Sequence, residues 1–168
     1  MPPRVNLRLS TSTRQNEVAT IPQESMRGVI DALATIELDE VARCVCTLPE
    51  DNFAVGFDSG TLHVYGSDGV VINSAALDSR IVGLASLQGV LVAGTNTGGV
   101  QAFNNEPLWI HPLESGCEAV TASSFHAVVA DGSGRLVSLA EDGSKVAQVE
   151  VGHVISLTCS PDGVCAAA

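Results

Sequence analysis

The chain has 168 residues, of which 45% are apolar and 4% aromatic, and it carries a formal net charge of −11 at pH 7. A charge of this sign repels phosphate backbones and argues against a nucleic-acid partner, and no apolar run is long enough to cross a bilayer. The length suits one domain with a tail, and many small aliphatic residues with 16 glycines are typical of short strands joined by tight turns.

Residues 1–24 are predicted to form a disordered tail. The first 16, MPPRVNLRLSTSTRQN, hold three arginines, several Ser and Thr and no acidic residue, which is also the composition of an organelle transit peptide. Pro2 and Pro3 disfavour the helix that such a peptide would form. We therefore expect a tail on a cytoplasmic protein, with organelle targeting through residues 1–16 as the alternative.

Residues 25–38 have two interpretations. Met26, Val29, Ile30 and Leu33 would share one face of an amphipathic helix. The stretch ATIELDEVARCVC, however, aligns with AQVEVGHVISLTC near the end of the chain, where the first residues match an outermost strand. We predict a spare strand over residues 32–38, and residues 25–31 stay open between the two interpretations.

The remainder of the chain contains an internal repeat. Three stretches align on Gly60, Gly98 and Gly134, at spacings of 38 and 36 residues, and a fourth copy is cut short. In the second copy the apolar runs cover residues 80–87, 89–95, 98–103 and 107–111, with Gly and Asn between them. Such runs have the length of strands, and four antiparallel strands per repeat are the unit of a β-propeller blade.

The repeat predicts an all-β fold, an incomplete β-propeller. Four-stranded blades are expected at about residues 41–77, 80–113 and 117–151, and the first half of a fourth at about 153–168. An unclosed ring leaves unpaired strand edges. We therefore expect a longer polypeptide, a partner chain or a second copy in a homodimer to complete it.

Three of the repeats resemble known propeller families. GFDSGTLHVYGSDG is similar to a hairpin of WD40 repeats, with Asp58 at the turn and Tyr65 where that family places Trp. Gly152-His153, followed by SPDG, resembles the start of a WD40 blade, where the histidine bonds an aspartate of its own blade. GVLVAGTNTGGVQAFNNEPLWI, which ends at Trp109, resembles a quinoprotein-like (PQQ-like) repeat. The resemblance implies structural roles for these positions and partner binding through the propeller loops.

Cysteine and histidine are the residue types that most readily suggest chemistry. Cys44 and Cys46 share one face of a predicted strand, but no second pair completes a tetrahedral metal site, so we expect buried core cysteines. The histidines, His63, His111, His126 and His153, fall in different repeats. For Trp109, packing between blades is favoured over an exposed binding anchor. The Asp-Gly pairs are read as hairpin turns and not as calcium loops.

The sequence thus predicts a non-catalytic protein-interaction scaffold with no catalytic residue, cofactor or metal. A quinoprotein-like enzyme is one alternative, although the Cys-Cys dipeptide and acidic calcium loop of such enzymes are missing. A lipid-anchored adaptor is another, because Cys165 begins a C-terminal Cys-Ala-Ala-Ala. The small residues and acidic flank favour half of a blade there, and all five cysteines are expected to be reduced. The structural repeat positions are Asp58, Gly60, Tyr65, Gly98, Trp109, Gly134, Gly152 and His153.

Overall fold

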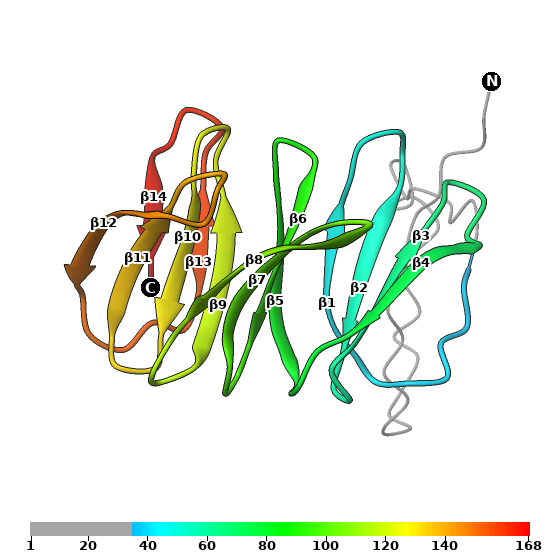
Figure 1. Cartoon of the computed structure of the whole chain (residues 1–168), viewed down its shortest axis with the longest axis horizontal. Coiled ribbons are helices and arrows are strands. Elements are labelled where there is room, and N and C mark those ends of the chain that lie inside the picture. Colours follow the sequence, from blue (N-terminus) through cyan, green and yellow to red (C-terminus); the bar gives the residue numbers. More distant parts are fainter. Residues whose placement is uncertain (1–34) are drawn as a thin grey trace, which may run out of the picture.

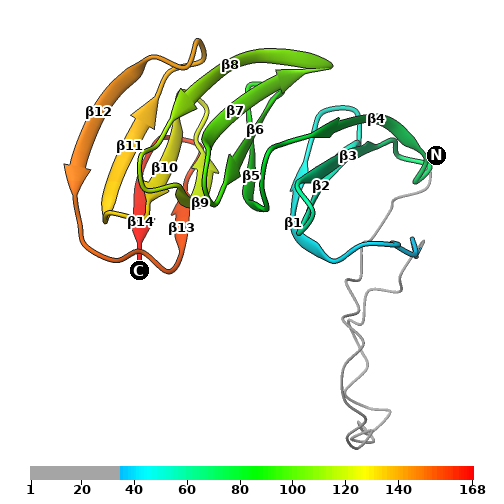
Figure 2. The ribbon, with the colours of Figure 1, turned by 60° about the horizontal axis from the view of Figure 1, so that its bottom comes forward.

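The computed structural model describes residues 35–168. Over this range the chain forms fourteen strands and no helix, arranged as four separate antiparallel sheets. The sheets stand side by side in chain order and fan out as an arc (Figures 1 and 2). We call them blades 1 to 4.

Each of the first three blades is a four-stranded meander in which consecutive strands pair. Blade 1 consists of β1 (Ala42–Thr47), β2 (Phe53–Phe57), β3 (Thr61–Tyr65) and β4 (Val71–Ala76). Blade 2 consists of β5 (Ile81–Leu87), β6 (Val90–Thr95), β7 (Gly99–Asn104) and β8 (Glu106–Pro112). Blade 3 consists of β9 (Cys117–Ala122), β10 (Ala127–Asp131), β11 (Arg135–Leu139) and β12 (Lys145–Glu150). Blade 4 has only β13 (Leu157–Cys159) and β14 (Cys165–Ala167).

The core lies between the blades, because the second strand of each complete blade is covered on both faces. All residues of β2 and β10, and all but the first of β6, are buried. Their sequences, FAVGF, VLVAGT and AVVAD, are nearly continuous apolar runs without the alternation of a half-exposed strand. The fourth strands lie at the outer side of the arc and are largely exposed, β12 along its whole length (Figure 2).

Neighbouring blades interlock through a bulge and a glycine. Pairing between the first and second strands shifts at one place in every complete blade, next to Ala42, Ile81 and Cys117. A Cβ on Gly56 would lie 2.7 Å from Cγ2 of Ile81, and one on Gly94 would lie 2.5 Å from Sγ of Cys117. Glycine in the second strand therefore makes room for the first strand of the next blade.

The predicted fold class, an all-β incomplete propeller with three complete blades and part of a fourth, is confirmed. The spare strand predicted at 32–38 is wrong over residues 35–38, which form no strand. This segment joins none of the described sheets. Its side chains Ile36 and Leu38 pack instead on the blade 1 cluster of Phe53, Val55, Phe57 and Tyr65. The predicted tail at 1–24 and the alternatives for 25–31 lie outside the described residues.

Candidate functional site

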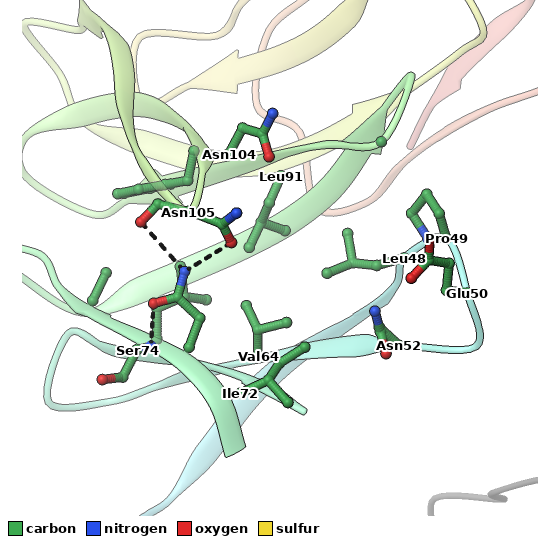
Figure 3. Close-up of a pocket in the computed structure, with 15 residues that line it drawn as sticks. Leu48, Pro49, Glu50, Asn52, Val64, Ile72, Ser74, Leu91, Asn104 and Asn105 are labelled. Atoms are coloured by element: carbon green, nitrogen blue, oxygen red, sulfur yellow. Dashed lines mark hydrogen bonds between the residues drawn. The ribbon is translucent and has the colours of Figure 1, made fainter. Parts of the chain in front are cut away.

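A groove of about 360 Å³ lies between blades 1 and 2 (Figure 3). The turn between β1 and β2, strands β3 and β4, and the turn between β7 and β8 enclose it. Leu62, Leu91 and Phe103 supply buried apolar surface, whereas Glu50 and Asn105 are polar and exposed. Its volume falls within the range of about 300–1,000 Å³ that is usual for ligand sites.

Asn73 of β4 bridges the two blades at this groove. Its Nδ2 donates a hydrogen bond to the main-chain oxygen of Asn105, at 3.3 Å, and lies 3.4 Å from the Asn105 side-chain oxygen (Figure 3). The main-chain nitrogen of Ser74 donates to Oδ1 of Asn73 at 2.8 Å. Asn105 is held in the turn with a φ of +62°, which Asn tolerates better than most residues. The groove is thus lined by an oriented amide and a main-chain carbonyl.

Trp109 of β8 makes the corresponding bridge from blade 2 to blade 3. Its Nε1 donates a hydrogen bond to the main-chain oxygen of Glu141 at 2.7 Å. The ring lies against Gly143, where a Cβ would come within 2.5 Å of Cδ2. Trp109 also packs against the buried cluster between these two blades. The structure therefore places the single tryptophan between neighbouring blades.

The turns between second and third strands hold two different carboxylates. Asp58 is half-exposed and lies 2.8 Å from the guanidinium of Arg43 and 3.9 Å from that of Arg80. Asp131 is fully buried and accepts hydrogen bonds from both the main chain and the side chain of Ser133 and of Arg135. Burial raises the pKa of Asp131, but these hydrogen bonds outweigh it and hold the pKa below its usual value.

Sequence reasoning treated Asp131 only as part of a hairpin turn. Asp131 is the most completely buried ionisable group among residues 35–168. It is the last residue of β10, and its side chain accepts hydrogen bonds from the main chain of the turn that follows. The available signal was a carboxylate closing an apolar run, followed by Ser at the second and Arg at the fourth position after it. Asp58, in the corresponding turn of blade 1, is the first residue after its strand and is half-exposed.

The repeat glycines occupy the same turns. Gly60 and Gly134 have φ values of +90° and +84°, which a side chain would strain. In blade 2 the positive φ, +122°, falls on Gly99, one residue after the predicted position Gly98. Gly98 instead donates its main-chain hydrogen bond to Oγ1 of Thr95.

Tyr65 lies at the end of β3, on the open face of blade 1. It stacks on Phe53 with ring centroids 5.0 Å apart and an interplanar angle of 6°. Its hydroxyl lies 3.4 Å from Nδ1 of His63. Burial, followed by the charges of Asp39 and Glu40, raises the pKa of Tyr65. Tyr65 is therefore an anchor of the packing on this face.

The start of blade 4 differs from what the WD40 resemblance implies. Gly152 adopts a φ of +86°. His153 is mostly exposed, and its Nδ1 lies 3.5 Å from a carboxylate oxygen of Glu118 in blade 3, so it faces a neighbouring blade. In blade 1, Glu40 stands where the resemblance would place Gly-His, and it accepts a hydrogen bond from Ser59 in the turn of its own blade.

The free cysteines are core residues. Cys44 and Cys46 pack on the cluster between blades 1 and 2, and Cys117 is buried between blades 2 and 3. Burial raises the pKa of Cys44 and Cys46 to about 11 and that of Cys117 to about 12. Within residues 35–168, no three His, Cys, Asp or Glu side chains lie close enough to hold a metal ion.

Cys165 corrects two expectations drawn from the sequence. It forms a disulfide with Cys159, directly opposite in the β13–β14 pair, so these two cysteines are not reduced. A disulfide-bonded sulfur is not available for a lipid thioether, so the alternative of a lipid-anchored adaptor is not supported. The usable signal was a pair of cysteines flanking a Ser-Pro-Asp-Gly turn, which places them side by side on adjacent strands.

Alkylation should distinguish core cysteines from reactive ones. At pH 8 a thiol with a pKa near 11 is on the order of 0.1% thiolate, so we expect Cys44, Cys46 and Cys117 to react with iodoacetamide hundreds of times more slowly than in urea. Mass spectrometry of tryptic peptides measures the rate at each position. Labelling of the Cys44-Cys46 peptide as fast as in the unfolded chain would contradict the packing described.

Comparisons with known proteins bear on the fold. No family model matches the chain, and neither does any curated protein. Among solved structures, U3-55K superimposes with a TM-score of 0.72 at 12% identity, over 79% of this chain and 47% of that one. The RRP9 WD40 repeats give 0.72 at 10% identity, over 79% and 46%. BamB from Moraxella catarrhalis, a PQQ-like propeller, gives 0.60 at 22% identity, over 69% and 37%.

The chain folds as a series of β-propeller blades, similar in structure to WD40 and PQQ-like propellers. At these identities the similarity concerns the fold alone. The chain spans less than half the length of each of these structures. The part of the propeller that the structure describes contains no helix of the length and hydropathy needed to span a membrane.

Proposed function

We propose that this propeller is a non-catalytic scaffold that binds other proteins. The observation that supports it is the surface of the outer strands. Strands β4, β8 and β12 each end a sheet, so each has an unpaired edge among residues 35–168. Each also carries two large aliphatic side chains that are at least 44% exposed: Val71, Ile72, Leu108, Ile110, Val146 and Val149.

This combination favours association with other chains. An exposed strand edge offers a row of main-chain donors and acceptors to an incoming strand. Exposed aliphatic side chains grouped on the same strands add apolar area that is removed from water on binding. Because three successive blades repeat the arrangement, an extended partner could contact several of them (Figure 2).

The loops remain the second route to a partner. Phe125, in the turn between β9 and β10, is 59% exposed, and Ile155, before β13, is 81% exposed. Loops on a rigid scaffold commonly carry binding residues. Binding through the loops and binding through the outer strands are therefore separable by substitution.

Completion of the ring is part of the same proposal. Blade 4 has strands only beside the inner half of blade 3. Val149 on β12 and Val151, which directly follows this strand, remain exposed. Further propeller strands, from a longer polypeptide, a partner or a second copy, would cover this open face. Light scattering across a dilution series would show whether a second copy does so.

Affinity capture with matched variants tests the scaffold. The tagged protein is compared with a Leu108→Thr/Ile110→Thr double variant and with a Phe125→Ser/Ile155→Ser double variant, each checked for folding by circular dichroism. We expect the outer-strand variant to lose partners that the loop variant retains. If only the loop variant lost captured partners, the loops and not the outer strands would be the binding surface. If all three proteins captured identical partners, neither surface would bind them specifically.

A further inference from the structure

The groove between blades 1 and 2 is the counterpart of the space that Trp109 fills between blades 2 and 3. Asn73 pairs with Val64 in the β3–β4 ladder, and Trp109 pairs with Ala102 in the β7–β8 ladder, which is the same place in each blade. Both side-chain nitrogens donate to the main-chain oxygen of the residue 32 positions later, in the corresponding turn of the next blade. Asn73 and Trp109 are therefore equivalent positions.

The surfaces around the two positions are equivalent as well. By strand register, five residues lining the groove correspond to five residues of the buried cluster on which Trp109 packs. The groove residues are Leu48, Leu62, Val64, Leu91 and Phe103, and their counterparts, in the same order, are Leu87, Val100, Ala102, Ala127 and Leu139. In blade 2, the indole of Trp109 covers this apolar surface. In blade 1, the shorter amide side chain of Asn73 leaves the space above the corresponding surface open.

The groove retains the chemistry that an indole needs. The main-chain oxygen of Asn105 has two lone pairs, of which Asn73 engages one, so it can accept a second N–H. Leu62, Leu91 and Phe103 provide an apolar floor. Among the described residues that line the groove, Glu50 is the one ionisable side chain, so the field at the rim favours cations.

We propose that this groove binds a tryptophan side chain of a partner protein, from a segment in which basic residues flank the tryptophan. The indole lies on Leu62, Leu91 and Phe103 and donates its N–H to the oxygen of Asn105, as Trp109 does to that of Glu141. A flanking Lys or Arg faces Glu50. The inference specifies one site of the proposed scaffold and rests on that function, although the two are tested separately.

Titration calorimetry with the blocked peptide acetyl-Lys-Trp-Lys-amide tests the site. We expect binding to the unmodified protein and at least about tenfold weaker binding to Asn73→Trp, whose own indole would occupy the groove. The matched control is Ala147→Trp, which places the same residue at the equivalent position of blade 3, away from the groove. At low salt, Glu50→Gln should bind the peptide about threefold more weakly than the unmodified protein does. At high salt, where the charge is screened, the two proteins should bind it equally.

A control peptide, a small indole amine and one spectrum complete the test. Acetyl-Lys-Ala-Lys-amide should not bind, and tryptamine should bind more weakly than the tryptophan peptide. Chemical-shift changes in the unmodified protein should centre on the amides of Gly89, Asn104 and Asn105, a readout that needs no variant. Equal binding by the alanine peptide, shifts elsewhere, or unchanged affinity of Asn73→Trp would overturn the site. Tighter binding of tryptamine than of the tryptophan peptide would also overturn the proposal, because it would indicate that the groove is a small-molecule site. None of these results would alter partner capture by the outer strands, which tests the scaffold separately.

Discussion

Replacement of Asp131 with Ala should lower the free energy of unfolding by about 3 kcal/mol, since it removes a fully buried carboxylate that accepts hydrogen bonds from two main-chain N–H groups and pairs with a partly exposed arginine. The substitution leaves two main-chain N–H groups, at Ser133 and Arg135, without their acceptor and leaves the Arg135 guanidinium without its partner. Urea unfolding at pH 7, followed by the fluorescence of Trp109, measures the change.

Asp58→Ala is the matched control. It also removes a carboxylate bound by arginine in the turn between second and third strands, but this carboxylate is half-exposed. Solvent screening limits such a pair to about 1 kcal/mol or less. Equal losses in the two variants would show that burial does not set the difference.

The same pair should make stability depend on pH. The pKa of Asp131 is lower in the folded chain than in the unfolded one, so ionised Asp131 stabilises the fold above the unfolded value of about 4. That stability is lost as the pH falls through the folded pKa. The difference in unfolding free energy between the unmodified protein and Asp131→Asn should therefore be greatest near neutral pH and shrink in acid. A difference that stays constant down to about pH 2 would contradict this account.

Trp109→Ala should lower the free energy of unfolding by about 3 kcal/mol. This is the lower end of the range for removing a large aromatic side chain from a core, because part of the Trp109 ring reaches solvent. The substitution opens a cavity between blades 2 and 3 and removes the hydrogen bond to Glu141. Thermal unfolding followed by circular dichroism measures it, since the chain then contains no tryptophan.

Leu108→Ala supplies the control on the adjacent residue. Leu108 is 53% exposed and lies on the opposite face of the same strand, so its truncation should change stability by less than about 0.5 kcal/mol. A loss as large as that of Trp109→Ala would indicate that β8 itself, and not the interface between blades, is sensitive to substitution.

The blades were predictable from sequence because their signals are local. Strand lengths and turn glycines can be identified within short stretches of sequence, and the spacing of Gly60, Gly98 and Gly134 indicates that these stretches repeat. The structure contains the predicted three complete blades and part of a fourth. The strand predicted at 32–38 is wrong over residues 35–38, because a strand needs a partner to pair with and this segment pairs with none of the described strands. Its alternating apolar residues, Ile36 and Leu38, pack without pairing.

The groove could not be predicted, because it depends on contacts between blades, and the buried carboxylate was missed, because its burial depends on its position relative to the end of its strand. Asn73 is unremarkable in the sequence until β4 is aligned with β8, when it takes the place of Trp109. Asp131 and Asp58 differ by one position relative to the ends of their strands, and this single residue decides between a fully buried and a half-exposed carboxylate. The disulfide between Cys159 and Cys165 likewise follows from pairing.

The interlock of Gly56 with Ile81 and of Gly94 with Cys117 has a consequence for how such a chain can change over evolution. These contacts lie on the first two strands of each blade, so the angle between blades is set near the inside of the arc. Positions on the fourth strands then do not have to set this angle. Asn73, Trp109 and Ala147, which are three different residue types, occupy the same position in their blades. Each interface can therefore acquire its own outer surface while the arrangement of the blades is kept.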